Sequence, residues 1–303
     1  MDWPSVGVVV PTRGGDRPLR PTLDAIEAQD YPGRLRTIVV YDGAPADWML
    51  AHGGERPRMV LANWRSPGLA GARNTGAAAL DTDLVAFCDD VDSWLPGKLT
   101  AQVTALAEEP GAEFATTAIE VAYQRRVAVR RLGAARVGPG ALLRARPAAL
   151  HPSTFLIRRA ALLGDLGMYA EDAPGTQNEA WDLLLRAAER APLVHVDTPL
   201  VRVRWPHHDN AGHGYDARIT SLRWMMGRHP EIVAYRPGAA RVYGKLACWS
   251  AASGQRSQAW RYARAAARLN WREPRVAIAA AAASRLVRVE SILELLQRHG
   301  RGI

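Results

Sequence analysis

The sequence predicts an α/β fold in which a largely parallel sheet is covered by helices on both faces and is followed by a helical extension. Short apolar runs rich in valine and isoleucine alternate with stretches of helical periodicity up to about residue 217. This alternation is typical of parallel sheets, because each crossover between parallel strands usually contains a helix. From residue 218 onward the pattern is helical throughout. We therefore expect one domain at residues 1–217 and a basic helical extension at residues 218–303.

Three apolar runs predict buried strands that end in turn residues. The first, Val6 to Val10, stops at Pro11, which cannot donate a hydrogen bond to a strand ladder. The second runs from Thr37 to Tyr41, and the third from Leu84 to Cys88. Further strands are expected at residues 59–61, 114–123 and 155–157, and as a pair interrupted by Pro199 at residues 193–203. Ligands bind beyond the carboxyl ends of parallel strands, so polar residues there are the first candidates for a site.

Helices are predicted where apolar residues recur every three or four positions. In the first domain these stretches lie at residues 20–29, 68–80, 96–108 and 180–191. Pro21 is compatible with the first turn of its helix, where the missing amide donor costs nothing. In the extension they lie at residues 218–227, 239–252, 255–269 and 274–297. The early strands are thus followed by helices, as a doubly covered sheet requires.

The composition excludes several classes of protein. Of 303 residues, 48% are hydrophobic and 23% are charged, which rules out a disordered or fibrous chain. The longest apolar run, Val276 to Ala283, is far shorter than the ~18 residues that span a bilayer. The first residues lack the basic and apolar regions of a signal peptide. Cys88 and Cys248 are the only cysteines, too few for a disulfide framework or a zinc site. We expect a cytoplasmic protein.

The net charge of +9 is concentrated in the extension. A one-sided stripe of arginines recurs there at Arg261, Arg264, Arg268, Arg272 and Arg275. A basic helical face is usually solvated. The alternatives are an anionic membrane surface, which would place the protein peripherally at the inner face of the membrane, an anionic acceptor, or a second copy in a homodimer. The chain lacks a nucleic-acid-binding signature, so we expect no nucleic acid partner.

An acidic cluster follows the third predicted strand directly. Asp89, Asp90 and Asp92 stand within four residues, and carboxylates this close repel one another. A divalent cation relieves that repulsion most simply, and Mg²⁺ or Mn²⁺ suits a site that also holds a diphosphate. The alternative is a helix cap or a solvated acidic turn.

Four motifs in order resemble the family 2 glycosyltransferases of GT-A fold. They read Val8-Val9-Val10-Pro11-Thr12-Arg13, Ile38-Val39-Val40-Tyr41-Asp42-Gly43-Ala44, Gly71-Ala72-Arg73-Asn74-Thr75-Gly76, and Phe87-Cys88-Asp89-Asp90-Val91-Asp92-Ser93-Trp94-Leu95-Pro96 followed by Lys98-Leu99. In that family they form a strand end, an acidic turn, a helix start and a DxD-type motif. The resemblance covers about the first 215 residues.

The resemblance implies an inverting, metal-dependent transfer of a sugar from a nucleotide-diphosphate donor to a hydroxyl acceptor. The acceptor is a glycan, a lipid-linked saccharide or a small molecule such as a natural product. The residues implied for binding the nucleotide-sugar are Pro11, Thr12, Arg13, Asp42, Arg73, Asn74, Asp89 and Asp90. Those implied as ligands of Mg²⁺ or Mn²⁺ are Asp90, Asp92 and His207. Tyr41 and Ala44 depart from the family's acidic turn, and Val91 stands where many relatives have another Asp.

A second segment, residues 178–186, resembles the family's E-D-W-D-L-W-L-R sequence. An acidic residue at this helix start is the general base, which takes the proton from the attacking hydroxyl. Ala180 stands at the family's usual Asp, so Glu179 is the expected base and Asp182 the alternative. Both also fit a first helical turn whose negative charge favours the helix dipole.

Histidines supply the remaining candidates. His207 and His208 follow the last predicted strand, where they also fit a polar surface loop. The resemblance to GT-A enzymes implies that a late histidine can complete the metal site, and His207 or His208 is the candidate, with His207 named first. His151 lies in Leu150-His151-Pro152-Ser153, and there we favour a role in ordering the loop.

Three other functions compete with glycosyl transfer. A nucleotidyltransferase needs a glycine-rich strand end that cradles a triphosphate, and Pro11 removes a donor from it. A nucleic-acid or anionic-surface binder would act through the basic extension. A degenerate protein that binds nucleotide-sugar without turnover would explain Ala180 and Val91.

Overall fold

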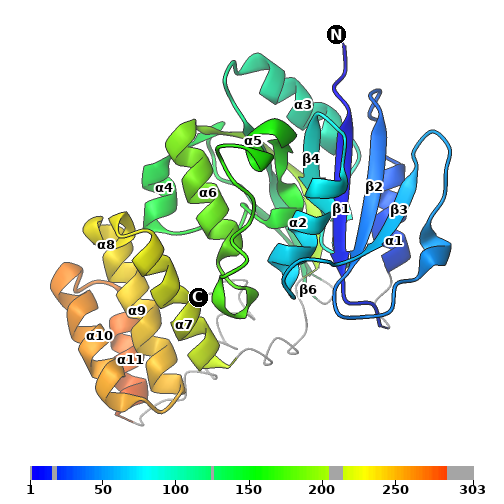
Figure 1. Ribbon diagram of the computed structural model, residues 1–303. Helices are drawn as coiled ribbons and strands as arrows, with labels where there is room; N and C mark the ends of the chain where they lie inside the picture. The colour runs from blue at the N-terminus through cyan, green and yellow to red at the C-terminus, as the bar shows by residue number, and fades with distance from the viewer. Residues whose placement is uncertain (1, 16–18, 124–125, 205–213, 285–303) are drawn as a thin grey trace. The chain divides into compact units, whose positions relative to one another are not determined.

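The computed structural model describes residues 2–15, 19–123, 126–204 and 214–284. Its strands form one sheet in the order β3-β2-β1-β4-β9-β6-β10-β5, with β7 beside β6 and β8 beside β10. The strands are β1 Val6–Thr12, β2 Leu35–Tyr41, β3 Arg58–Ala62, β4 Leu84–Phe87, β5 Ser93–Trp94, β6 Phe114–Tyr123, β7 Arg126–Arg130, β8 Arg136–Val137, β9 Leu156–Arg158 and β10 Leu193–Arg204. Figure 1 shows helices on both sides of this sheet. The α/β architecture expected from the sequence is confirmed.

Strand β1 lies at the centre of the parallel part of the sheet. It pairs in parallel with β2 on one side and with β4 on the other, and β2 pairs in parallel with β3. Every residue of β1 is buried, so both of its faces are covered. A run of valines suits this position, since β-branched side chains pack well on a sheet with two apolar faces. The ends of β1, β2 and β4 therefore point to the same edge.

Beyond β4 the sheet is mixed. Strand β9 lies between β4 and β6 and is antiparallel to both. The segment 193–203, expected as two strands, forms the single strand β10, which runs parallel to β6 with register shifts on both sides of Pro199. Proline cannot donate to the ladder, so the pairing is interrupted there while the strand continues.

The helices of this part of the chain are short and lie between strands. They are α1 Leu19–Glu27, η1 Trp48–Leu50, α2 Leu69–Ala79, α3 Lys98–Glu108, α4 Pro139–Arg144, η2 Pro152–Thr154, α5 Arg159–Leu163, η3 Pro174–Thr176 and α6 Glu179–Arg190. Helix α2 packs very closely on β1: a Cβ at Gly76 would lie 2.4 Å from Cγ1 of Val9. A Cβ at Gly71 would lie 1.9 Å from the carbonyl oxygen of Ser66. Gly71 thus lets the first turn of α2 lie against Ser66, and Gly76 lets the later part of the helix lie against β1.

The chain divides into two compact units. The first holds residues 1–139, 147–171 and 179–206, and the second holds residues 140–146, 172–178 and 207–303. The second unit contains α7 Tyr215–Arg228, α8 Glu231–Ala234, α9 Arg236–Ala252, α10 Arg256–Leu269 and α11 Pro274–Ala283, drawn yellow to orange in Figure 1. The single boundary at residue 217 stays a prediction, as these units draw two short earlier segments into the helical part.

Small residues hold the helical unit together. Its core includes Ala247 and Cys248 of α9, Ala263 of α10 and Ala279 of α11, all buried. Side chains of this size let the three helices approach one another closely. None of the described helices is both long and apolar enough to cross a membrane.

Candidate active site

The acidic cluster lies at the carboxyl end of β4, where neighbouring elements hold its backbone. Thr12, the last residue of β1, donates from Oγ1 to Oδ2 of Asp90 at 2.7 Å. Thr22 of α1 places its hydroxyl 2.7 Å from the carbonyl oxygen of Asp92 and 3.1 Å from that of Asp90. The carboxylate of Asp90 is thus turned toward β1 and is 7% exposed. The turn that carries the cluster is fixed from two sides.

Asp92 is the most deeply buried of the three carboxylates. It accepts hydrogen bonds from Oγ of Ser153 at 2.5 Å and from the amide of Arg204 at 3.1 Å. Ser153 also accepts a hydrogen bond from the amide of Asp89 at 3.0 Å, so one hydroxyl joins two members of the cluster. Burial and the nearby charge of Asp89 raise the pKa of Asp92 to about 8, although its two donors oppose the rise.

His151 completes a group able to hold a metal ion. It caps η2, and its Nδ1 lies 3.4 Å from Oδ2 of Asp92 while its Nε2 lies 4.0 Å from Oδ2 of Asp89. Asp89, Asp92 and His151 each offer a ligand atom, and these atoms lie within 4.8 Å of one another. Carboxylate oxygens with one imidazole nitrogen suit Mn²⁺ or Mg²⁺. The residues therefore fit a divalent cation.

This group differs in composition from the expected metal ligands. Asp92 belongs to both sets, but the structure gathers Asp89 and His151 around it, while the carboxylate of Asp90 bonds to Thr12. His207 lies outside the described residues. The local sequence around His151 gives no signal of this proximity. The pairing of β9 with β4 brings residues 151–155 to the end of β4.

Arg73 of α2 links the cluster to helix α6. Its Nη2 donates to Oδ1 of Asp89 at 2.8 Å and its Nη1 to Oε1 of Glu179 at 2.9 Å, with the guanidinium 5.1 Å from the ring centre of Tyr169. Arg73 is 1% exposed. Burial by itself lowers the pKa of this guanidinium. The electrostatic effects of Asp89, Tyr169 and Glu179 raise the pKa by more than burial lowers it, so Arg73 stays a cation. One guanidinium here faces several carboxylates, which leaves an excess of negative charge.

The two expected bases lie in different surroundings. Glu179 begins α6, is 5% exposed, and uses Oε1 for the bond to Arg73. Asp182 is fully buried and accepts two hydrogen bonds from Arg186, at 3.0 and 2.8 Å. Arg186 in turn donates to the backbone oxygens of residues 166–168. Glu179 therefore joins the acidic group through Arg73, whereas Asp182 helps to fix a loop.

Asp42 lies at the carboxyl end of β2, against the N-terminus of α2. Its Oδ1 accepts a hydrogen bond from Nδ2 of Asn63 at 2.8 Å, and the amide of Gly68 lies 3.0 Å from its Oδ2. Gly68 has φ of 117°, which only glycine adopts readily. Nε of Arg13 lies 3.6 Å from Oδ2 of Asp42, with the arginine side chain 63% exposed. Carboxylate and cation thus stand together at this strand edge.

The remaining expected residues are Pro11 and Asn74. Pro11 is buried within β1. Asn74 is 1% exposed and is hydrogen-bonded to both backbone groups of Tyr169, donating to its oxygen at 2.9 Å and accepting from its amide at 3.0 Å. It also donates to Glu171 at 2.7 Å. The contacts of Asn74 therefore join α2 to residues 169–171.

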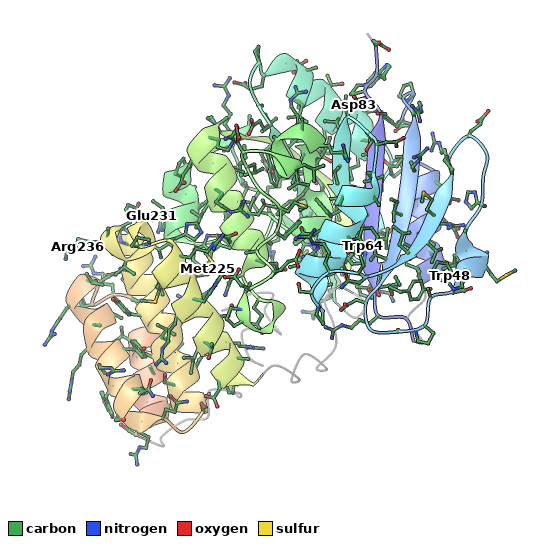
Figure 2. All side chains as sticks on the ribbon, in the orientation of Figure 1. Trp48, Trp64, Asp83, Met225, Glu231 and Arg236 are labelled. Atoms are coloured by element: carbon green, nitrogen blue, oxygen red, sulfur yellow. The ribbon has the colours of Figure 1, made fainter. Side chains whose placement is uncertain are left out.

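The sequence did not single out Glu171, which accepts a hydrogen bond from Asn74, or the exposed Trp64. Glu171 accepts hydrogen bonds from Asn74, Ser66 and Arg65, which lower its pKa to about 2 against the opposing effect of burial. Trp64, labelled in Figure 2, follows β3. It is 58% exposed. No signal in the local sequence distinguishes these two residues from ordinary loop residues.

The W-L-P-x-K-L motif is structural. Lys98 is fully buried, with Nζ 3.8 Å from the ring centre of Trp94 and 2.7 Å from Oε1 of Gln102. Burial lowers the pKa of Lys98 to about 7. Trp94 donates from Nε1 to the carbonyl oxygen of Ser153 at 3.0 Å. The motif thus fixes the serine that joins Asp89 to Asp92.

Comparisons with known proteins agree with the expected fold. A family model described as "Glycosyl transferase family 2" matches residues 7–162. The structure of residues 1–349 of S. aureus TarS in complex with UDP-GlcNAc has a TM-score of 0.66 and 15% identity, covering 98% of this chain and 92% of that chain. No curated protein matches the sequence.

A second solved structure similar to this chain is a mannosyltransferase. The mannosyltransferase PcManGT from Pyrobaculum calidifontis, in complex with GDP-Man and Mn²⁺, has a TM-score of 0.55 and 19% identity, covering 93% of this chain and 80% of that chain. Identities this low show the fold alone. With the family model, they confirm the predicted GT-A fold.

Proposed function

Since the chain belongs to glycosyl transferase family 2, we propose that this glycosyltransferase uses a nucleoside diphosphate sugar, a divalent cation and an inverting mechanism. The observation that carries the proposal is the meeting of Asp89, Asp92 and His151 beside the buried pair of Arg73 and Glu179. The known structures similar to it include complexes with UDP-GlcNAc and with GDP-Man and Mn²⁺, which supports the donor class and the cation.

Asp89, Asp92 and His151 would hold the cation. Several carboxylates share this region with one guanidinium, so a divalent cation would reduce an unfavourable excess of negative charge. When bound, Mg²⁺ or Mn²⁺ would neutralise charge on the departing diphosphate. Ser153 and the Arg204 amide would keep the Asp92 carboxylate in one orientation while it acts as a ligand.

The nucleoside would bind at the carboxyl ends of β1 and β2. Asp42, whose carboxylate is anchored by Asn63 and Gly68, would accept hydrogen bonds from the base or ribose. Thr12 would hold Asp90 close to the ribose, and the exposed Arg13 would contribute positive charge. Pro11, Asn74 and Arg73 would line the donor pocket. The polar groups of Asn74 and Arg73 bond mainly to other protein residues, so these side chains would mainly hold the shape of the pocket.

Glu179 would act as the general base. It would take the proton of the acceptor hydroxyl as that oxygen attacks the anomeric carbon. The bond from the anomeric carbon to the diphosphate oxygen would break, and the nucleoside diphosphate would leave on the opposite face with its electron pair. The hydrogen bond from Arg73 uses Oε1, which leaves Oε2 to receive the proton. We favour Glu179 over Asp182, whose carboxylate pairs with Arg186.

Calorimetric titration of UDP, GDP, dTDP and CDP, with and without Mn²⁺, tests the donor site. We expect one nucleotide to bind in a Mn²⁺-dependent way and to lose at least about tenfold in affinity in Asp92→Asn and His151→Gln. Asp24→Asn, an exposed carboxylate on α1, is the matched control. Binding that is independent of metal, or unchanged in both variants, would refute the metal assignment.

A second candidate function is nucleotide-sugar binding without turnover. It is favoured by Ala180, which is buried where the family has its acidic base, and by the ion pair that engages Glu179. Glu179→Gln separates the two functions. An active enzyme should lose about 10²- to 10⁴-fold in rate while nucleotide binding persists. The degenerate protein would show no transfer before or after the change.

The acceptor and the location stay predictions. A glycan, a lipid-linked saccharide and a small molecule are all consistent with an acceptor hydroxyl near Glu179. Cytoplasmic location, peripheral contact with an anionic membrane and a homodimer likewise await direct measurement.

A further inference from the structure

A cluster of cations lies within the helical unit and shares no residue with the candidate active site. Arg241 and Lys245 are one turn apart on α9 and so share a face of that helix. Arg275, on α11, packs against the same stretch of α9: a Cβ at Gly244 would lie 3.0 Å from Cβ of Arg275. The absence of a side chain at Gly244 thus lets α11 bring a third cation close to α9.

The positive charge of this cluster is poorly balanced. The charge of Glu273 acts on Arg241 and Lys245, and its Oε1 accepts a hydrogen bond from Nη1 of Arg275. The exposed Arg144 and Arg146, from the segment 140–146 of the same unit, add further positive charge. Among the described residues, Glu273 therefore lies with three cations of this cluster, Arg241, Lys245 and Arg275.

Donors in the cluster also lack acceptors. Nε of Arg241 and Nε of Arg275 are both buried, and neither has a hydrogen-bond partner in the described part of the chain. Arg275 as a whole is 8% exposed. A buried N–H group without an acceptor is costly, so such groups normally mark a missing partner.

The lowered pKa of Lys245 is consistent with this excess of positive charge. Burial, followed by the charges of Arg241, Arg275 and Arg146, lowers the pKa of Lys245 to about 7, against the opposing effect of Glu273. The pKa of a lysine falls where other positive charges are crowded around it and where burial disfavours its charged form. An anion beside these groups would balance the excess positive charge and would also supply acceptors for the buried Nε donors of Arg241 and Arg275.

We propose that Arg241, Lys245 and Arg275 bind a phosphate group. Guanidinium groups match the oxygens of a phosphate with paired donors, and a lysine adds a compact charge. A tetrahedral phosphate offers several acceptor oxygens, enough for donors that converge from two helices. The phosphate is either a free anion or the headgroup of a lipid, and the same three side chains would recognise both.

Titration of the full chain with inorganic phosphate tests the proposal. The measurement is made at pH 7 and low ionic strength in the presence of EDTA, so that no metal contributes at the donor site. We expect phosphate to raise the melting temperature. We also expect Arg241→Met and Lys245→Met to bind phosphate about 10- to 100-fold more weakly, the loss of one charge-assisted hydrogen bond. Arg264→Met, an exposed arginine on α10, is the control that removes the same charge and should bind as the unchanged protein does.

The ligand-free proteins give a second readout. Without phosphate, Lys245→Met should melt at a higher temperature than the unchanged chain, because it removes like-charge repulsion. Lys245→Arg keeps the charge and should keep phosphate binding, which guards against a variant that fails to fold. No phosphate effect on the unchanged chain, or the same effect in Lys245→Met and Arg264→Met, would overturn the proposal.

Vesicles distinguish the two sources of phosphate. Co-sedimentation with phosphatidic acid but not with phosphatidylcholine, lost in Lys245→Met, supports a lipid headgroup. Binding of inorganic phosphate without binding to vesicles supports a soluble ligand. Binding to neither overturns the site. Asp92→Asn should leave every one of these results unchanged, so failure of this proposal is distinct from failure of the donor site.

Discussion

Replacing Arg73 by methionine should destabilise the protein more than most single substitutions. The side chain is 1% exposed, and its two donors hold Asp89 at 2.8 Å and Glu179 at 2.9 Å. Methionine fills a similar volume but leaves both carboxylates without their cation. Each hydrogen bond to a charged group contributes about 1.5–3 kcal/mol, and breaking a buried ion pair costs about 3–5 kcal/mol. We expect a loss of about 4 kcal/mol.

Urea unfolding followed by circular dichroism, in the absence of metal, measures this loss. Arg73→Lys keeps the charge but not the fork that reaches both carboxylates, so it should lose less. Combining Arg73→Met with Glu179→Gln removes one of the stranded charges and should recover part of the stability. If Arg73→Met lost less than about 1 kcal/mol with an unchanged denaturant slope, the reasoning would be refuted, because the guanidinium would then not be neutralising these carboxylates.

Three further predictions concern stability. Gly76→Ala should cost about 1–3 kcal/mol in urea unfolding, because the new methyl group would lie 2.4 Å from Val9, whereas Gly53→Ala, with open space around it, should cost almost nothing. Asp92→Asn should melt above the unchanged protein at pH 8 without metal, and a lower melting temperature would contradict this. The pKa of Asp92 is raised to about 8, so in the metal-free protein its contribution is favourable at low pH and is lost as pH rises toward 8. In saturating Mn²⁺, Asp92→Asn should no longer melt above the unchanged protein. The pKa of Glu171 is lowered to about 2, so its contribution is full above about pH 4.5 and is lost as pH falls toward 2, by up to about 3 kcal/mol. In Glu171→Gln, the free energy of unfolding should fall less between pH 4.5 and pH 2 than in the unchanged protein. An equal fall in both proteins would refute this role of Glu171.

Local pattern was enough for the longer strands and helices up to β6, but it did not predict the short β5 or the strands β7 and β8. The valine run of β1 predicts a strand buried on both faces, and the structure buries every residue of it. Pro199 misled the prediction, because a proline breaks a ladder hydrogen bond without ending the strand. The start of α6 was predicted within one residue, since Glu179 precedes the first apolar position of its helix.

The candidate site was predicted only in part. Asp92 was expected as a metal ligand from its place after β4, and it lies in the metal-capable group. His151 was expected to order a loop, which it does by capping η2, but it also faces Asp89 and Asp92. Glu179 was expected near the chemistry from its motif, but its ion pair with Arg73 joins residues 106 positions apart.

By itself the sequence determined most of the longer strands and helices, the family, and the acidic cluster, because each depends on residues close together in the chain. Hydrophobic period, turn residues and motif order are all local properties. Only the tertiary structure decided which partners meet at the cluster, because those contacts follow from the order of strands in the sheet. Strand β9 inserts between β4 and β6 and carries His151 and Ser153 to Asp92. The cations of α9 and α11 are likewise brought together by packing at Gly244, which no local pattern encodes.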